Sequence, residues 1–198
     1  MKLKTRRAES EDDRKEIDSL FRALGIERNW DVETVIDLPP ENCLDVVAHD
    51  EDGRMVAALR LIYRDVKYFP INKKEGWPNL LLESDGSIGE VALSVVVPDC
   101  RGDNSVFLSL YCQMYWEAKT MGISRIYAIL DSIIFLLYKR VGFRFIKIEA
   151  SEGGGEKLYW GETTFPAFLD LEDTYSFIRE RKANLWQILQ QTSPLIER

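Results

Sequence analysis

A polar turn at residues 98–105 joins an apolar, strand-like run to a helical pattern and carries Arg101, Asn104 and Ser105. A strand that passes through such a turn into a helix gathers free backbone N–H groups and the positive end of the helix dipole at one point. That point favours the binding of a phosphate. Asn104 or Ser105 is also well placed to cap the helix. The turn is therefore the first candidate binding site in the chain.

The run before this turn, residues 88–97, alternates in character. Its odd-numbered residues from position 91 onward are apolar and would share a core face of an extended chain, whereas the even-numbered residues would share the opposite face. The even-numbered set is Glu90, Ala92, Ser94 and Val96. We expect this second face to meet a ligand. Burial of Glu90 there would raise its pKa toward the range useful to a general base, although a solvated glutamate at a strand start is the alternative.

The elements that must position these residues indicate an α/β chain with a mixed sheet. Apolar residues at three- and four-residue spacing predict a helix over residues 106–121, followed by a strand at 123–130 and a second helix at 131–143. Two strand-like runs, 44–49 and 55–63, flank the turn signal DEDG and predict an antiparallel hairpin. The hairpin and the later elements together would form one sheet with helices packed against it.

The outer parts of the chain carry further signals. A strand is expected at residues 144–150 and a C-terminal helix at 171–191. The long connection at 65–87 is rich in aromatic and apolar residues, so it either covers an apolar ligand or is pinned to the core by its aromatic side chains. The length fits one domain that spans residues 1–198.

The order strand, RGDNS turn, helix, strand and a helix ending in LYKRVGF (residues 137–143) resembles the core of the GNAT superfamily of N-acyltransferases. The segment YWGETTFPAFLD, residues 159–170, extends the resemblance to the long-chain N-acyl amino acid synthases of the N-acyl tyrosine synthase type, which are related to the acyl-homoserine lactone autoinducer synthases. The resemblance implies splayed central strands flanked by helices, with the pantetheine arm of a thioester donor in the gap. It also implies that the segment at 27–41 covers the acceptor side.

The resemblance also implies roles for single residues. It makes Glu90 the general base, acting directly or through water, and it makes Tyr138, the tyrosine of LYKRVGF, the acid for the leaving thiolate. An aromatic residue on a helix is often only part of the core, which is the alternative for Tyr138. The oxyanion is expected to meet a backbone N–H in the stretch that contains Ser94, Val95 and Val96, beside the donor arm.

The phosphate-binding turn departs from the pattern of the superfamily. Arg101 matches its first position, but Asn104 and Val106 stand where two small residues are expected. Glycine lets the backbone approach a pyrophosphate closely, so its absence favours a donor with a single phosphodiester. We therefore expect the acyl group to arrive on the phosphopantetheine of an acyl carrier protein, with Arg101, Asn104 and Ser105 at the phosphate and no tightly bound cofactor.

A long acyl chain needs apolar walls, which contribute about 0.8 kcal/mol for each buried CH₂ group. Candidate wall residues are Phe107, Leu110, Tyr111 and Phe135, all of which suit an ordinary core equally well.

The carboxylate of an amino acid acceptor calls for an arginine, because a guanidinium binds a carboxylate with two parallel hydrogen bonds. The candidates are Arg60 and Arg64, which share a parity in the second strand of the hairpin, and Arg101. An outward-facing pair at a sheet edge is the alternative for Arg60 and Arg64.

Composition limits the partners. The formal net charge of −7 argues against nucleic acid, which needs a dense positive field. Three cysteines in no CxxC pair and a single histidine argue against a metal site. No apolar stretch reaches the roughly 18 residues of a membrane span, and the N-terminus lacks the apolar region of a signal peptide, so we expect a cytoplasmic protein.

Basic residues gather near the proposed donor region, despite the negative net charge. They are Lys139, Arg140, Arg144 and Lys147. Local fields steer association more than net charge does, so this group is a candidate docking patch for an acidic carrier protein, and ordinary solvated surface is the alternative.

The sequence thus predicts transfer of a long-chain fatty acyl group from an acyl carrier protein thioester to the α-amino group of an amino acid, with tyrosine as the expected acceptor. Three alternatives stay open. They are an N-acetyltransferase that uses acetyl-CoA, an acyl-homoserine lactone synthase, and an acyl-binding module without catalysis.

Overall fold

The computed structural model of the chain describes residues 2–73, 76, 77, 80, 82 and 86–192. These residues form one eight-stranded sheet in the order β1-β2-β3-β4-β5-β8-β6, and β7 pairs with β8. Neighbouring strands are antiparallel except β4 and β5, which are parallel. The strands are β1 (Lys4–Arg7), β2 (Cys43–His49), β3 (Met55–Tyr63), β4 (Ile88–Val96), β5 (Arg125–Asp131), β6 (Ile146–Lys147), β7 (Lys157–Tyr159) and β8 (Glu162–Asp170).

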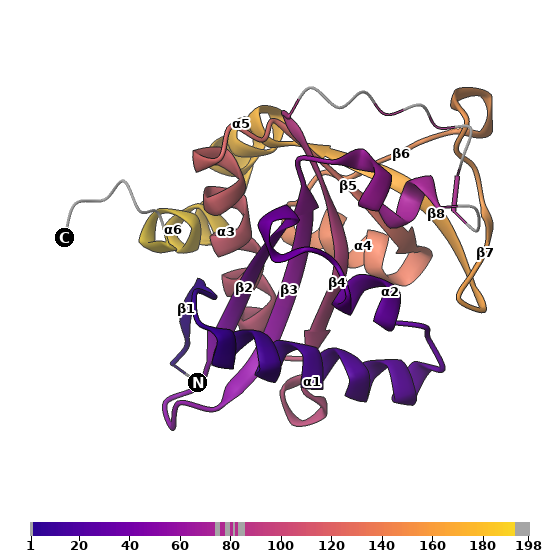
Figure 1. Cartoon of the computed structure of the whole chain (residues 1–198). Helices are drawn as coiled ribbons and strands as arrows, with labels where there is room; N and C mark the ends of the chain where they lie inside the picture. Colours follow the sequence, from indigo (N-terminus) through magenta and orange to yellow (C-terminus); the bar gives the residue numbers. More distant parts are fainter. Residues whose placement is uncertain (1, 74–75, 78–79, 81, 83–85, 193–198) are drawn as a thin grey trace.

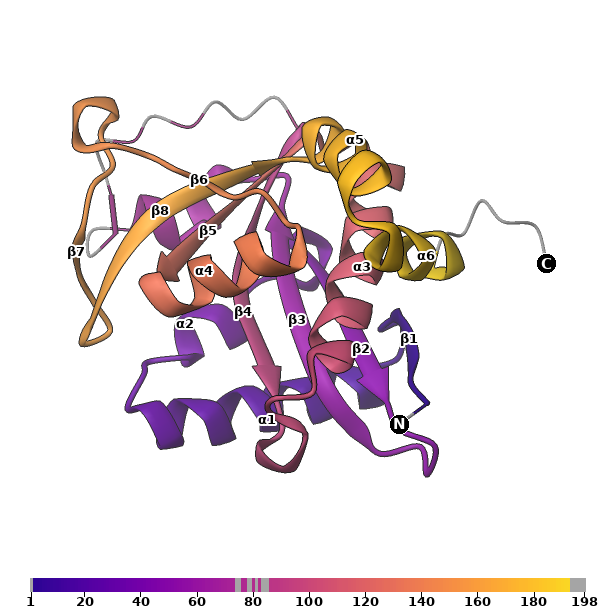
Figure 2. The same ribbon diagram turned by 180° about the vertical axis from the view of Figure 1, so that it is seen from behind.

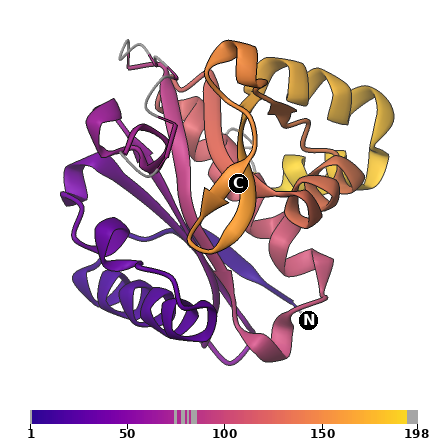
Figure 3. The same ribbon diagram turned by 90° about the vertical axis from the view of Figure 1, so that its right-hand side faces the viewer.

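Helices cover both faces of this sheet. α1 (Glu11–Arg28) and α2 (Glu33–Ile36) lie on the face seen in Figure 1. α3 (Asn104–Thr120), α4 (Ser132–Val141), α5 (Leu171–Arg181) and α6 (Ala183–Thr192) lie on the face seen in Figure 2. In Figure 3 the indigo α1 and the yellow α5 and α6 stand on opposite sides of the strands. One hydrophobic core therefore lies on each side of the sheet.

Local signals define α1 well. Ser10 caps its N-terminus in a capping box with Asp13, and Asn29 ends it in the left-handed conformation. Ile17 and Phe21 are fully buried at a four-residue spacing. The helix therefore lays its apolar stripe on the sheet, where it contacts β3 and β4.

A bulge in β4 changes which side chains share a face. Leu93 lies opposite Arg60 of β3, whereas Val91 lies opposite the next residue of β3, Leu61, so Ala92 is the extra residue. Beyond the bulge the alternation reverses, and Leu93 packs on the α1 side while Val91 packs on the α3 side. The prediction of one uninterrupted alternation along residues 88–97 is wrong for this reason.

The two parallel strands at the centre of the sheet separate, as the resemblance to the GNAT superfamily implies. β4 and β5 pair from Ile88 with Arg125 to Val91 with Ala128 and no further, although both strands continue. The bulge next to Val91 bends β4 away from β5 at the point where the ladder ends. The backbone groups of the two strand ends therefore face each other across a gap.

The C-terminal helix is present but broken. The prediction of one helix over residues 171–191 is corrected to α5 and α6, because Lys182 has a non-helical conformation (φ −135°, ψ 66°). The break lets α6 turn back onto α3, where the indole N–H of Trp116 donates to the carbonyl of Leu189 at 2.6 Å. Packing of Leu185 and Leu189 in the core thus outweighs helix propensity at this point.

The strand predicted at residues 144–150 is reduced to β6, and its end forms a short 3-10 turn (Ala150–Glu152). Within the described part of the chain, no helix combines the length and the hydropathy that crossing a bilayer demands.

Candidate active site

A cavity of about 440 Å³ opens where β4 and β5 separate. It is lined from both sides of the sheet. Leu24 and Trp30 contribute from the α1 side, and Phe107 and Tyr138 contribute from α3 and α4. The cavity therefore passes through the gap between the two strands, which is what a thin ligand arm between them requires.

Glu90 lies in this cavity and is fully buried. Its two carboxylate oxygens accept the backbone N–H of Ile71 at 3.1 and 3.2 Å. Burial raises the pKa of Glu90 well above its usual value, and the Ile71 hydrogen bond opposes this rise only in part. The solvated alternative is therefore wrong. A carboxylate in this state can accept a proton near neutral pH.

Tyr138 also lines the cavity, where its hydroxyl belongs to a chain of three. It donates to the hydroxyl of Tyr111, and Tyr111 in turn donates to the hydroxyl of Ser94 at 3.2 Å. Burial and the neighbouring Tyr111 raise the pKa of Tyr138 well above its usual value, so the phenol is neutral and able to donate. Tyr111 was expected as an acyl-chain wall, and its place in this chain of hydroxyls was not foreseen.

Ser94 and Glu90 reach the cavity from opposite faces of β4. Ser94 bonds to α3 through Tyr111, whereas Glu90 bonds to the short 3-10 turn that contains Ile71, on the α1 side. The bulge at Ala92 is the cause, because it inserts one residue between them. Val95 and Val96 also line the cavity, next to the open edge of β4.

The turn before α3 borders the cavity with Arg101 and Asn104. Carboxylates of the chain itself already bind the groups of this turn that would hold a phosphate. Asp103, rather than Asn104 or Ser105, caps α3, and its carboxylate accepts the backbone N–H of Ser105 at 2.8 Å. Arg101 is held by both carboxylate oxygens of Glu27, at 2.5 and 2.6 Å. A phosphate at this turn must therefore displace or share the contacts of two carboxylates of the chain itself.

The predicted acyl-chain walls divide into two pairs. Phe107 and Tyr111 line the cavity. Leu110 is buried in the core beside them, and Phe135 packs edge-on against Phe165 at 5.3 Å, so neither of these two reaches the cavity. Ile134 and Leu137 of α4 take their place along the wall, together with Ala128 and the last residues of β5.

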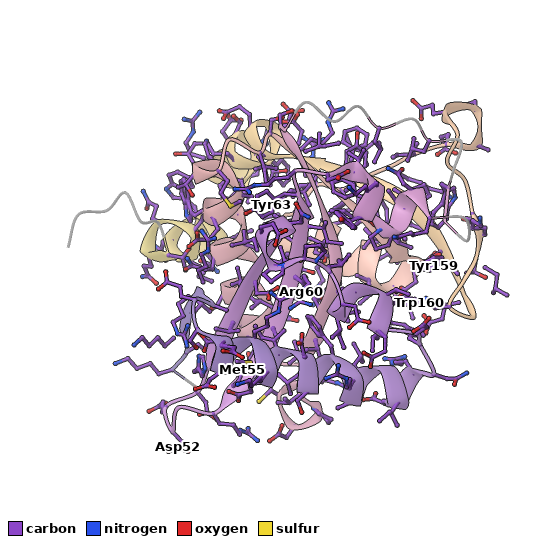
Figure 4. The ribbon with its side chains drawn as sticks, viewed as in Figure 1. Asp52, Met55, Arg60, Tyr63, Tyr159 and Trp160 are labelled. Atoms are coloured by element: carbon purple, nitrogen blue, oxygen red, sulfur yellow. The ribbon has the colours of Figure 1, made fainter. Side chains whose placement is uncertain are left out.

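Arg60 does not reach the cavity, and its predicted place at the acceptor is wrong. The side chain is fully buried beneath α1, where it bonds Asp45 twice at 2.8 Å and Asp18 at 3.2 Å. It also donates to the carbonyl of Val35 at 3.0 Å. Burial alone would lower the pKa of Arg60, but the nearby carboxylates of Asp45 and Asp18 raise it, and the net result is a pKa above the usual value for arginine. Figure 4 shows Arg60 at the centre of the sheet, apart from Tyr159 and Trp160.

Arg64 lies at the end of β3 in a left-handed conformation (φ 70°), with its guanidinium 5.3 Å from the ring of Tyr63. It is exposed and is not part of the cavity wall. The structure therefore places Arg64 outside the cavity, and its predicted place at the acceptor carboxylate is wrong.

The basic group beside the donor region is largely at the surface. Lys139 and Arg140 are exposed at the end of α4, and Arg144 lies over the ring of Phe177 at 4.9 Å. Lys147 forms an ion pair with Glu156 at 2.8 Å. On the same helix Ile133 and Leu136 are 79% and 61% exposed, so α4 presents apolar and basic side chains together.

The described part of the long connection at 65–87 packs inward. Phe69 and Ile71 are fully buried, and the indole N–H of Trp77 donates to the carbonyl of Gly155 at 2.8 Å. This supports the alternative in which aromatic side chains pin the connection to the core, and Pro70 also borders the cavity. Part of the expected acyl cover falls at positions 74, 75, 78, 79, 81 and 83–85, outside the described residues.

The end of the cavity under the last turn of α1 was not predicted. It is formed by Arg28, Trp30, Tyr159, Trp160 and Thr164. Two signals were present in the sequence, since the segment at 27–41 was expected to cover the acceptor and the YW pair begins the segment at 159–170. Neither signal could bring them together, because the residues are more than a hundred positions apart.

This arrangement has the parts that acyl transfer needs. A buried carboxylate with a raised pKa and a neutral phenol face one cavity from opposite sides of β4. The open edge of β4 adds backbone groups that the sheet does not use. These supply a base, an acid and donors for a developing oxyanion.

No protein-family model matches the sequence, and no curated protein is significantly similar to it. Solved structures do share its fold. An acetyltransferase of the GNAT family from Staphylococcus aureus superposes with a TM-score of 0.59 at 12% identity, over 86% of this chain and 99% of that one. The chain therefore has the GNAT-like acyltransferase fold, with the splayed central strands that the sequence predicted.

Two solved structures from a narrower group are also similar. FeeM, an N-acyl amino acid synthase from uncultured soil microbes, has a TM-score of 0.68 at 13% identity, over 89% of this chain and 94% of that one. BjaI, a CoA-dependent acyl-homoserine lactone synthase, has a TM-score of 0.64 at 19% identity, over 94% and 85%. The resemblance to these synthases is confirmed at the level of the fold.

Proposed function

We propose that the protein is an N-acyltransferase that moves a long-chain fatty acyl group from a phosphopantetheine thioester to the α-amino group of an amino acid. The observation that carries this proposal is the cavity between β4 and β5, with Glu90 and Tyr138 in its wall. The similarity of the fold to FeeM, an N-acyl amino acid synthase, supports the same chemistry.

In this proposal Glu90 accepts a proton from the α-ammonium group of the acceptor. The free amine then attacks the thioester carbonyl carbon, and a C–N bond forms. The oxyanion of the tetrahedral intermediate is stabilised by backbone N–H groups on the open edge of β4, around Val95. The C–S bond breaks, and the departing thiolate takes the proton of Tyr138. The nitrogen of the new amide loses its second proton to the Tyr138 phenolate, which restores the phenol that bonds Tyr111, and Glu90 releases its proton to solvent.

The acyl donor in this proposal is an acyl carrier protein thioester. The turn at 98–105 lacks two glycines of the superfamily pattern, and Asp103 and Glu27 occupy its donors and its arginine, so the site suits one phosphodiester better than a pyrophosphate. The basic residues beside exposed Ile133 and Leu136 suit an acidic protein partner.

A CoA thioester is the second candidate donor, because BjaI, which shares the fold, is described as CoA-dependent. The test supplies purified protein with a long-chain acyl group on carrier protein or on CoA and with a mixture of amino acids, and it detects N-acyl products by mass spectrometry. We expect an N-acyl amino acid and a higher kcat/KM for the carrier thioester.

Comparable efficiency with CoA would remove the argument from the turn. Product formed only with S-adenosylmethionine would replace the proposal by acyl-homoserine lactone synthesis. Absence of any transfer, with the acyl thioester still bound, would leave an acyl-binding module.

A further inference from the structure

The end of the cavity under α1 is built from segments far apart in the sequence. Arg28 and Trp30 come from the end of α1 and the residues after it, and Tyr159 and Trp160 come from the hairpin of β7 and β8. The rings form a continuous wall, with centroids 5.4 Å apart for Trp30 and Trp160 and 5.1 Å apart for Tyr159 and Trp160. Figure 4 shows Tyr159 and Trp160 next to each other at this end of the molecule.

Arg28 and Arg101 both line the cavity, but their ion pairs differ in length. The ion pairs of Arg28 with Glu27 and Glu162 are 3.8 and 3.9 Å long, the two longest among the described residues and beyond hydrogen-bonding distance. Arg101 is instead held by two short bonds to Glu27. The Arg28 side chain is half exposed and its guanidinium lies 5.9 Å from the ring of Trp30. It therefore retains donors for a ligand.

Two residues that line this end of the cavity each carry a buried polar atom that has no hydrogen-bond partner among the described residues. These atoms are the indole N–H of Trp30 and the hydroxyl of Thr164, a residue that is only 7% exposed. A buried polar group without a partner destabilises the fold, so folded proteins rarely keep one where no ligand or water can bind it. Both atoms indicate a polar ligand at this end of the cavity.

The backbone at Trp160 gives an independent indication. Trp160 (φ 49°) and Gly161 (φ 82°) are the two central residues of the hairpin turn between β7 and β8, and both have the positive φ of a type I′ turn. Asn, Asp or Gly suits that position, whereas a bulky aromatic residue there is rare because its Cβ crowds the backbone in the left-handed region. Trp160 thus lines the cavity although its backbone conformation is one that tryptophan rarely adopts.

We infer that Arg28, Trp30, Tyr159 and Trp160 form the subsite for an acceptor that bears a carboxylate and an aromatic side chain. Arg28 binds the carboxylate with the indole N–H of Trp30 as a further donor, and the rings of Tyr159 and Trp160 contact the side chain of the acceptor. The hydroxyl of Thr164 is a partner for a polar group of the ligand. This inference rests on the proposed function and assigns the acceptor end of the same cavity.

The test compares the kcat/KM of L-tyrosine with that of tyramine, which has the same ring and amine and no carboxylate. We expect Arg28→Gln to lower kcat/KM for tyrosine by at least about tenfold, through KM, because a charge-assisted hydrogen bond is lost. The value for tyramine should change less than about twofold. Arg22→Gln is the matched control, since Arg22 lies on the same helix but pairs with Glu33 outside the cavity.

An equal effect of Arg28→Gln on the two amines would overturn the inference and leave the proposed function standing. If the wild-type protein acylates no amine at all, the proposed function falls, and calorimetry with tyrosine and tyramine then decides the subsite by itself. Binding of tyrosine that is stronger than that of tyramine, and lost in Arg28→Gln, supports it. Equal binding of both, or binding of neither, overturns it.

A second variant tests the aromatic wall. Trp160→Asn places a residue that suits the left-handed turn, so the hairpin is expected to fold at least as well. We expect the ratio of kcat/KM for tyrosine to that for leucine to fall about fivefold or more, since an aromatic contact contributes on the order of 1 kcal/mol. An unchanged ratio would remove Trp160 from the subsite.

Discussion

Two arginines on the α1 side of the sheet show how the same side chain serves two purposes. Arg60, beneath α1, lies 5.4 Å from the ring of Phe21 and is bonded by Asp45, Asp18 and a backbone carbonyl. Arg28, at the end of α1, lies 5.9 Å from the ring of Trp30, and its ion pairs are 3.8 Å or longer. The guanidinium of Arg60 therefore has hydrogen-bond partners within the protein, whereas the ion pairs of Arg28 are too long to be hydrogen bonds.

The difference teaches where to look for a ligand. A buried charge whose partners are all supplied by the chain contributes to structure, because removing either partner leaves the other unpaired in a poorly hydrated place. A cavity with long ion pairs and unpartnered polar atoms retains donors and acceptors that only a ligand can use. Sequence parity had made Arg60 a candidate for the acceptor together with Arg64, and its burial excludes Arg60.

The largest effect is expected at Arg60, the arginine whose partners all belong to the protein. Arg60→Gln leaves Asp45 and Asp18 without their cation, and we expect the free energy of unfolding to fall by about 3 kcal/mol or more. Urea denaturation measures it. Arg22→Gln, which breaks an exposed pair with Glu33, should lower it far less, because solvent screens an exposed pair. Equal losses for the two variants would show that the Arg60 group is no more structural than a surface pair.

The next effect concerns Glu90, which is as buried as Arg60 but has no cation bonded to it among the described residues. Glu90→Gln should lower kcat about 100-fold or more, as expected for loss of a general base. In the wild type kcat/KM should rise with pH through a pKa above the usual glutamate range. Glu51→Gln, on the exposed turn between β2 and β3, is the control. Unchanged turnover in Glu90→Gln would remove Glu90 as the base.

The same residue makes a prediction about stability. The pKa of Glu90 is higher in the folded state than in the unfolded state, so the folded protein holds a proton that the unfolded chain releases between the two values. The free energy of unfolding contributed by Glu90 therefore falls as pH rises through this window. Glu90→Gln should become more stable relative to wild type as the pH is raised. A difference that does not depend on pH, measured by urea denaturation, would contradict the shifted pKa.

A smaller effect is expected at the exposed pair between Glu27 and Arg101. Glu27→Gln frees the guanidinium that the donor phosphate needs, and we expect KM for the thioester donor to fall a few-fold at most, since solvent weakens an exposed pair. Glu33→Gln, which frees Arg22 instead, should leave KM unchanged. A rise in KM would mean that the ion pair shapes the donor site rather than blocking it.

The smallest effect concerns the basic patch. Reversing the charges of Arg140 and Arg144 should weaken use of the carrier-protein thioester at low salt and leave a free pantetheine thioester unaffected, because exposed charges act mainly on association. The salt dependence of kcat/KM for the two donors checks it. The same loss for both donors would discard the patch.

Several parts of the protein could be predicted from its sequence. Alternation predicted β4, the DEDG turn predicted the hairpin of β2 and β3, and the polar turn before α3 predicted where a helix begins. Glu90 and Tyr138 were placed in one site by resemblance, and the structure brings both to one cavity. Other expectations required knowing which side chains face the cavity after folding. Leu110 and Phe135, expected as acyl-chain walls, and Arg64, expected at the acceptor carboxylate, lie outside it.

By itself the sequence determined the order of strands and helices, since local periodicity and turn residues act over a few positions. Only the tertiary structure decided the bulge at Ala92, the pairing of Arg60 with Asp45, and the meeting of Arg28 with Trp160. Each of these depends on which residues lie opposite one another after folding. A shift of one residue in register exchanges the faces of a strand, and no local pattern encodes that register.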